Sequence, residues 1–235
     1  MEAIYQSLAE TAITQYEALK NRSTEVSPRL LIAVAGPPGS GKTTSTTAIA
    51  ALVNAKTSSS IATVVSMDGF HWPRSYLDKL PNREEAYIRR GAPWTFDAES
   101  IVALIHQLRT TDAGTYAPTF DHAAKDPVAN GLLVPAMSKI VFLEGNYLLV
   151  DENPWCKVKE LVDMCWLVTV DQEVARLRVA RRHVAAGIEK DMESALKRVD
   201  RNDTLNGVYI MEHSRASADV LVESIDNSEL NIRRT

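Results

Sequence analysis

The sequence predicts an α/β fold, a three-layer α/β/α sandwich around a mostly parallel central sheet. Two features of the chain predict it. Runs of aliphatic and β-branched residues alternate with helical patterns, and a glycine-rich segment joins the first such run to the helix that follows it. Continuous apolar runs are typical of strands buried on both faces, as in parallel sheets. Hydrophobic residues make up 45% of the chain, which is enough for one core, so we expect a single domain over residues 1–235.

The elements are expected in the following order. Residues 1–27 predict an N-terminal amphipathic helix, because apolar residues recur there at helical spacing. Four apolar runs then predict parallel strands at 31–35, 61–67, 140–143 and 164–170. An insertion at 68–137 separates the second run from the third and is expected to build the pocket of a second substrate; within it, Asp97 should cap a helix. Residues 171–187 predict a helix with a basic stripe, 198–211 a loop, and 218–224 a final strand.

The glycine-rich segment has the pattern G-x-x-x-x-G-K-[ST], which binds the phosphates of a nucleotide. Glycines allow the backbone N–H groups to approach a triphosphate closely, a lysine adds a positive charge at the β- and γ-phosphates, and a hydroxyl lies where Mg²⁺ would bind. Its position between a strand and a helix indicates a P-loop NTPase fold. The candidate nucleotide-binding residues are therefore Gly36, Pro37, Pro38, Gly39, Ser40, Gly41, Lys42, Thr43 and Thr44.

Two acidic residues, Asp68 and Glu144, end the second and third predicted strands. Ligands collect at the carboxyl ends of the strands in such a sheet, so both side chains should enter one crevice. Phosphoryl transfer to an alcohol uses one carboxylate to take the hydroxyl proton and another near Mg²⁺. We assign Asp68 as the catalytic base and Glu144, with Thr43, to the metal, although the two acids could exchange roles, or one could merely cap a loop.

Five motifs together resemble the phosphoribulokinase/uridine kinase family. They are GPPGSGKT at 36–43, MDGFH at 67–71, GAPWTFD at 91–97, PTFDH at 118–122 and LEGNYLL at 143–149. The resemblance spans about residues 32–187. It implies that Asp68 is the catalytic base and that Glu144 lies near the metal. It also implies that the segment resembling PTFDH contributes to recognition of the acceptor.

Candidate acceptor-binding residues follow from that segment and its surroundings. They are Asp68, His71, Tyr116, Phe120, Asp121 and His122. Two alternatives without a role in binding stay open. Residues 118–122 could be an ordinary surface hairpin, and His71 could belong to an aromatic lid on the core.

Arginines form two further candidate sites. Arg83, Arg89 and Arg90 could bind an anionic acceptor, or could form a solvated helix face that pairs with nearby glutamates. The helix at 171–187 resembles the arginine-bearing lid of the family, which we place at 171–190; its register is open between two alignments. A lid that carries arginines can close over ATP and stabilise charge on the transferred group. The candidate catalytic arginines are Arg178, Arg181 and Arg182, and the alternative is a charged surface helix.

Composition and absent motifs limit the function. The net charge of −4 disfavours partners bound by bulk positive charge, so we expect a small-molecule acceptor and neither nucleic acid nor membrane as a partner. Two cysteines without ligand spacing, and no apolar leader or membrane-length segment, predict a cytoplasmic protein. A homodimer stays open. The guanine-specific N-K-x-D motif is absent, which favours ATP as the nucleotide, with Mg²⁺.

The favoured function is an ATP- and Mg²⁺-dependent kinase that phosphorylates a hydroxyl of a small metabolite, with a uridine-like nucleoside as the first candidate. Pantothenate, nicotinamide riboside or a fructose-type sugar are alternatives within the same family. A nucleotide-gated regulatory module with weak ATPase activity is the alternative from another class. It would use the same phosphate-binding loop but would have no need of Asp68.

Overall fold

The computed structural model describes residues 1–23 and 28–225. Its centre is a five-stranded sheet with the order β2-β5-β1-β6-β7, in which every neighbouring pair is parallel. The strands are β1 (Leu30–Ala35), β2 (Ala62–Ser66), β5 (Ile140–Gly145), β6 (Met164–Thr169) and β7 (Val220–Glu223). The sequence-based prediction of a mostly parallel α/β sheet is confirmed.

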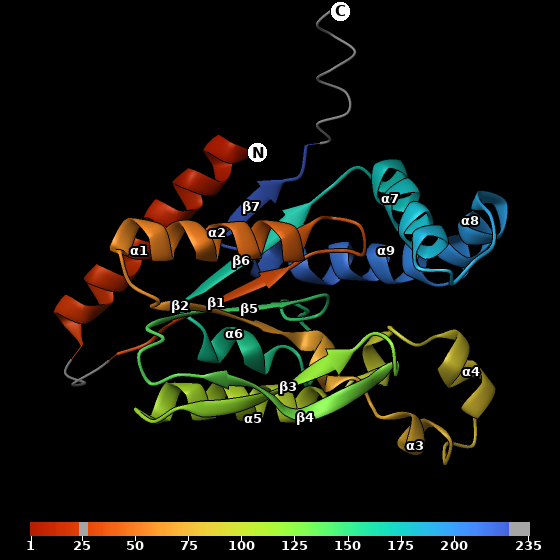
Figure 1. Ribbon diagram of the computed structural model, residues 1–235, viewed down its shortest axis with the longest axis horizontal. Helices are drawn as coiled ribbons and strands as arrows, with labels where there is room; N and C mark the ends of the chain where they lie inside the picture. The colour runs from red at the N-terminus through yellow and green to blue at the C-terminus, as the bar shows by residue number, and fades with distance from the viewer. Residues whose placement is uncertain (24–27, 226–235) are drawn as a thin grey trace, which may run out of the picture.

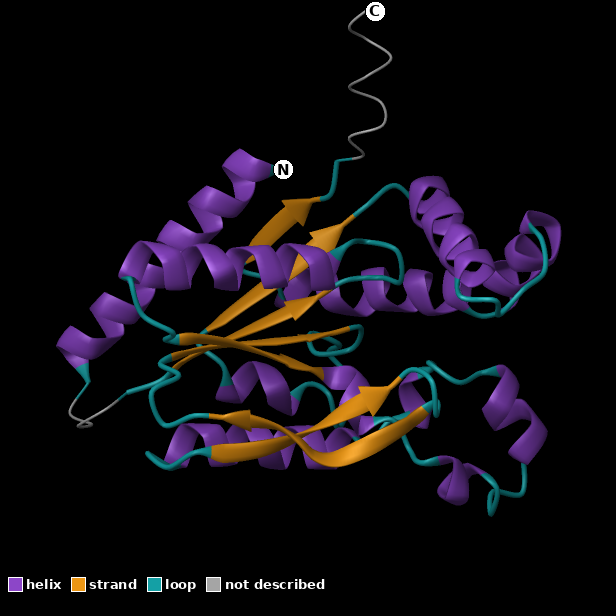
Figure 2. Ribbon diagram, in the orientation of Figure 1, coloured by secondary structure: helices purple, strands orange, loops and turns teal. Residues whose placement is uncertain are grey.

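Helices cover both faces of this sheet (Figures 1 and 2). On one face lie α1 (Glu2–Arg22) and α2 (Lys42–Thr57), and on the other lie α5 (Ala98–Thr110) and α6 (Lys157–Leu161). The predicted N-terminal helix at 1–27 ends at Arg22, and residues 24–27 lie outside the described residues. Among residues 1–23 and 28–225, no helix is long and apolar enough to span a bilayer.

The strands are apolar throughout because alternate side chains face the two helical layers. In β1, Leu31, Ala33 and Ala35 join the core beneath α5 and α6, whereas Leu30, Ile32 and Val34 join the core beneath α1 and α2. Glu144 at the end of β5 has the same parity as Phe142, which packs on the α1–α2 side. Its carboxylate is thereby directed toward the start of α2.

The insertion at 68–137 contains short helices, one longer helix and a hairpin. The 3-10 helix η1 (Met67–Phe70) follows β2 directly, and α5 begins after Asp97, whose carboxylate accepts a hydrogen bond from the Ser100 N–H, as the sequence predicts. Strands β3 (Thr115–Asp121) and β4 (Asp126–Val134) form a separate antiparallel pair. Between η1 and α5 lie α3 (Arg74–Leu77), α4 (Arg83–Ile88) and the 3-10 helix η2 (Pro93–Thr95).

The prediction of a loop at 198–211 is wrong. The chain there forms the end of α8 (Met192–Arg201) and most of α9 (Asp203–Ser214), before the 3-10 helix η3 (Arg215–Ser217) leads into β7. The basic helix predicted at 171–187 is α7 (Gln172–Ala185), capped by the Asp171 carboxylate. A small apolar cluster of Val179, Ala180, Ala195 and Val199 joins α7 to α8.

Candidate active site

The glycine-rich segment forms a tight loop between β1 and α2. Gly39 and Gly41 both have φ of +81°, a conformation that side chains with a Cβ rarely adopt. Gly41 is the N-cap of α2, and the first turn of that helix carries neither an acidic residue nor a side-chain cap. The unpaired N–H groups of this helix end therefore remain available to an anion.

The loop packs directly on α7. A Cβ added to Gly39 would lie 2.5 Å from the Ala175 carbonyl oxygen and 3.0 Å from Val179 Cγ2. The Arg178 guanidinium donates a hydrogen bond of 3.2 Å to the Gly39 carbonyl and one of 3.0 Å to Ser224 Oγ. The position of the loop is therefore coupled to the position of the basic helix.

Glu144 is almost fully buried, with 3% of its surface exposed, and it faces the start of α2. The Thr43 hydroxyl lies 3.2 Å from each carboxylate oxygen, and the Ser66 hydroxyl donates to Oε1 at 2.9 Å. Burial raises the pKa of Glu144, and the neighbouring Asp68 charge raises it further, while Lys42 and the two hydroxyls oppose the shift. A cation near this carboxylate would offset the cost of its burial.

Asp68 lies in η1, two residues beyond the end of β2. Its N–H donates to Ser66 Oγ at 3.2 Å, so one hydroxyl connects the backbone of Asp68 to the carboxylate of Glu144. The sheet register explains this, because Ser66 and Glu144 are direct partners on neighbouring strands. The two acids lie close enough for the charge of Asp68 to raise the pKa of Glu144.

Lys42 lies within the electrostatic reach of both acids. Burial lowers the pKa of Lys42, the negative charges of Glu144 and Asp68 raise it, and the positive charge of Arg182 lowers it. These four side chains come from α2, β5, η1 and α7. The structure thus gathers one lysine, two carboxylates and one arginine of the basic helix at the carboxyl end of the sheet.

Aromatic rings lie next to Asp68. The His71 ring is 4.0 Å from Phe96 and 4.9 Å from Phe120, measured between centroids, and Phe120 is 5.4 Å from the His122 ring. His71 Nδ1 lies 2.9 Å from the Asp68 carbonyl oxygen. Burial lowers the pKa of His71, while the charge of Asp68 opposes the shift. Three of the candidate acceptor residues, His71, Phe120 and His122, therefore form one group beside Asp68.

Two candidate acceptor residues stand apart from this group. Tyr116 is 58% exposed, and within the described chain it makes no ring contact or hydrogen bond with His71, Phe120 or His122. The Asp121 carboxylate accepts hydrogen bonds from the N–H groups of Ala123 and Ala124, which lowers its pKa. Asp121 thus stabilises the turn between β3 and β4.

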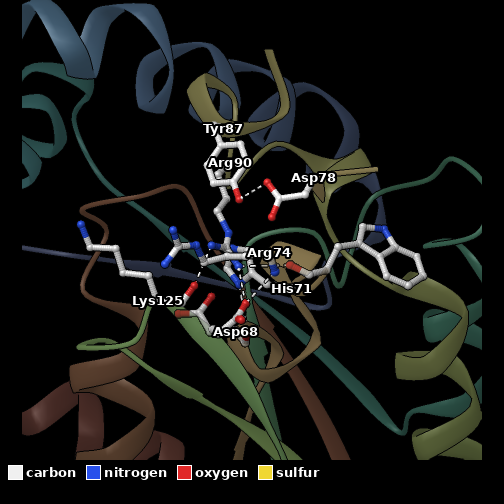
Figure 3. Close-up of polar contacts among 9 residues, drawn as sticks. Asp68, His71, Arg74, Asp78, Tyr87, Arg90 and Lys125 are labelled. Carbon is white, nitrogen blue, oxygen red and sulfur yellow. Dashed lines mark hydrogen bonds and ion pairs between the residues drawn. The ribbon is translucent and has the colours of Figure 1, made fainter. Parts of the chain in front are cut away.

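The three arginines at 83–90 do not form one helix face. Arg83 pairs with Asp78 in solvent, and Arg89 donates to the Arg201 carbonyl and to Asn206. Arg90 is only 15% exposed, and it donates to the carbonyls of Lys125 and Trp72 (Figure 3). Its guanidinium also lies 5.5 Å from the Phe120 ring centroid. The interpretation as a solvated face that pairs with glutamates is wrong for Arg89 and Arg90, because both bind backbone carbonyls of other elements.

The three candidate arginines of α7 differ in their surroundings. Arg178 contacts the phosphate-binding loop, whereas Arg181 and Arg182 are both exposed and form no hydrogen bond or ion pair with the described residues; of these two, the charge of Arg182 lowers the pKa of Lys42. A helix turns by about 100° per residue, so positions 181 and 182 both neighbour position 178 but lie on opposite sides of it. Arg176, which the sequence did not single out, binds Asp200 of α8 with two hydrogen bonds.

Comparison with known proteins decides the family. The model of the phosphoribulokinase/uridine kinase family matches residues 31–230. The chain belongs to this family. A protein named "Putative uridine kinase" from Schizosaccharomyces pombe is 38% identical over 217 residues, covering 91% of this chain and 92% of that protein. "ATP-dependent kinase YFH7" from Lachancea thermotolerans is 34% identical and covers 71% of this chain and 58% of its own length.

Solved structures of P-loop kinases share the fold. A "putative fructose transport system kinase" from Silicibacter sp. has a TM-score of 0.79 at 28% identity, covering 92% of this chain and 98% of that one. YFH7 from Saccharomyces cerevisiae has a TM-score of 0.82 at 22% identity, covering 94% and 99%. The chain is therefore a P-loop kinase of the phosphoribulokinase/uridine kinase family, and kinases of this family use ATP.

The sequence did not single out Ser66, and it named Arg90 only together with Arg83 and Arg89. Ser66 ends an apolar strand, and only the register of β2 against β5 shows that it faces Glu144. Arg90 was predicted as one of three equivalent arginines, and only the hairpin packing sets it apart. The signal that could have identified Ser66 is its position two residues before Asp68, at the strand end where ligands collect.

Proposed function

We propose that the chain is a Mg²⁺-dependent kinase that transfers the γ-phosphoryl group of ATP to a hydroxyl of a small metabolite. One observation carries the proposal: Ser66 Oγ binds both the backbone N–H of Asp68 and the carboxylate of Glu144, and the charges of both acids raise the pKa of Lys42 against the effect of its burial. A base for an alcohol and a charge for the phosphates are thereby close together. A protein that only senses a nucleotide would not need a base for an alcohol.

In the proposed reaction, the backbone N–H groups around Gly39 and Gly41 bind the phosphates and Lys42 balances their charge. The acceptor oxygen forms a bond to the γ-phosphorus as the bond to the β-bridging oxygen breaks. Asp68 orients the acceptor hydroxyl and takes its proton. Arg182, whose charge lowers the pKa of Lys42, would balance charge on the transferred group, and Arg178 would hold the loop against α7.

Thr43 and Glu144 are the residues that would hold Mg²⁺. A hydroxyl and a buried carboxylate are hard oxygen donors, and this metal binds through one or two carboxylates together with phosphate and water oxygens. When bound, the metal would neutralise charge on the phosphates. The raised pKa of Glu144 supports the assignment, because the carboxylate lacks a fully compensating charge of its own.

The acceptor is proposed to lie against His71, Phe120 and His122. Two imidazoles and a phenyl ring offer stacking and hydrogen bonding within reach of Asp68, which suits a nucleoside base and keeps a uridine-like acceptor the favoured candidate. A fructose-type sugar, pantothenate or nicotinamide riboside stay alternatives. Tyr116 and Asp121 are weaker candidates, because one is exposed and the other stabilises the hairpin turn.

A screen with labelled ATP over nucleosides, sugars and vitamins tests the proposal. We expect label to appear in one acceptor class, to require Mg²⁺ and to disappear with a chelator. If the protein binds ATP but labels no acceptor faster than it hydrolyses ATP without an acceptor, the result would contradict a kinase and favour the nucleotide-gated module.

Both cysteines are free thiols, which fits the proposed cytoplasmic location.

A further inference from the structure

A second cavity, separate from the phosphate-binding loop, lies between the start of α5 and the segment that precedes α6. It has a volume of about 350 Å³ and is lined by Trp72, Trp94, Trp155 and Tyr209, with Glu99 and Glu152 among its acidic residues. We infer that this cavity is a binding site for a small organic cation, a quaternary or protonated amine.

The walls of the cavity are unusually aromatic. The chain has four tryptophans, and three of them line this one space. Trp155 is 3% exposed and forms part of the floor, whereas Trp94 is 42% exposed. The ring of Phe96 meets Trp155 edge to face, at 6.3 Å between centroids and an interplanar angle of 77°. Trp72 stacks on Tyr76 at 4.3 Å between centroids, so the lining combines rings packed in the core with the exposed Trp94. Aromatic groups gathered around one space are how proteins recognise quaternary ammonium groups.

The described charged residues that line the cavity are all acidic. Asp97, Glu99 and Glu152 belong to the lining, and the described residues that line it include no lysine or arginine. Lys157 reaches Glu99 from outside at 3.1 Å, and Asp97 caps α5, so these two carboxylates are partly balanced. Glu152 accepts a hydrogen bond of 2.7 Å from the Tyr209 hydroxyl, and His213 Nδ1 lies 3.7 Å from its other carboxylate oxygen, so the carboxylate is held beside the aromatic wall without a lysine or arginine partner among the described residues. An occupant with a positive charge and apolar flanks complements this combination.

The cavity shares a wall with the candidate acceptor site. The Phe96 ring that touches Trp155 also lies 4.0 Å from the His71 ring, and Trp72 is bonded through its backbone N–H to Thr95 and through its carbonyl to Arg90. A cation in the cavity would therefore lie one aromatic ring from the acceptor group. The inference itself does not depend on which acceptor is phosphorylated, or on whether any is.

Intrinsic tryptophan fluorescence tests the site directly, because Trp72, Trp94 and Trp155 all report on it. The purified protein is titrated with choline and with benzyltrimethylammonium at constant ionic strength. The matched control is 3,3-dimethylbutan-1-ol, the neutral isostere of choline. We expect a saturable change with both cations and at least a threefold weaker response to the neutral alcohol.

Variants then locate the response, with calorimetric titration as a readout that does not depend on the removed indole. Trp94→Ala should weaken cation binding by about 2- to 30-fold, the range expected for one cation–π contact of ~0.5–2 kcal/mol. Trp94→Phe should retain part of the affinity, and Glu152→Gln should weaken binding about 3-fold or more. Glu212→Gln, an exposed carboxylate outside this cavity, should leave it unchanged. Circular dichroism checks that each variant is folded.

Three results would overturn the inference. They are no saturable response to either cation, an equal response to the neutral isostere, and binding that survives both Trp94→Ala and Glu152→Gln. The first would show that the cavity is not a cation site, the second that it selects only for apolar volume, and the third that the cation binds elsewhere.

Discussion

Comparing Gly39→Ala with Gly41→Ala separates two reasons why the phosphate-binding loop needs glycine, which are a positive φ and the close approach of α7. At Gly39 the substitution meets both a strained backbone, with φ of +81°, and the carbonyl oxygen of Ala175 at 2.5 Å. The backbone strain costs about 1–2 kcal/mol. The overlap adds about 1–3 kcal/mol if it behaves like an overpacked core. Gly41→Ala is the matched control, because its φ is also +81° but the nearest atom to the new Cβ is Ser224 Oγ at 3.7 Å.

The assay is thermal unfolding of the nucleotide-free proteins, followed by circular dichroism. For a chain of this size about 1 kcal/mol corresponds to roughly 2–4 °C in Tm, so Gly41→Ala should lower Tm by roughly 2–8 °C and Gly39→Ala by roughly 4–20 °C. The difference between the two variants isolates the contact with α7. Equal losses, or a larger loss for Gly41→Ala, would refute the claim that the loop is held against the basic helix.

Three further predictions concern the site and its surroundings. Ser66→Ala removes a hydrogen bond from the buried Glu144 carboxylate, so kcat/KM should fall about 10- to 100-fold, for ~1.5–3 kcal/mol of lost interaction energy. Because that hydrogen bond lowers the pKa of Glu144, its loss should move the pH–activity profile to higher pH, and an unchanged profile would contradict this. Arg90→Lys should raise KM for the acceptor several-fold with little change in KM for ATP, because Arg90 positions the hairpin through carbonyls and Phe120; an equal rise in both constants would contradict it. Burial lowers the pKa of both His71 and His183, so the unfolded chain binds protons more readily than the folded chain. The stability of the fold should therefore decrease as pH drops below about 6.5, the ordinary pKa of histidine. A Tm that does not change from pH 7.5 to 5.5 would contradict this prediction.

The sequence predicted those parts of the molecule that local patterns determine. Buried parallel strands are apolar along their whole length, and the glycine pattern specifies its own turn, so the sheet and the loop could be predicted without the structure. The helix α9 was missed because it contains Gly207 and begins at Asn202 and Asp203, residues typical of loops. Tertiary contacts outweigh that preference: the Asn206 side chain accepts a hydrogen bond from Arg89, and Ile210 is fully buried.

The sequence alone could not show which of two adjacent arginines contacts a given element when the partners are distant in sequence. Arg89 and Arg90 are adjacent, yet one binds α9 and the end of α8, and the other binds the β3–β4 hairpin. Arg181 and Arg182 are adjacent as well, and only Arg182 acts on Lys42. For Arg89 and Arg90 the partners come from elements distant in sequence, which a single sequence does not specify.

The central claim is that Asp68 activates an acceptor hydroxyl beside phosphates held by Lys42 and the loop. The most direct test compares Asp68→Asn with the unchanged protein in single-turnover phosphoryl transfer to the acceptor found by the screen, alongside equilibrium binding of ATP. Removal of a general base should slow transfer by about 10²- to 10⁴-fold, while the affinity for ATP stays within about twofold, since Asp68 lies outside the loop that binds phosphate. Transfer within tenfold of the unchanged protein, or an affinity for ATP that falls in parallel with transfer, would contradict the account.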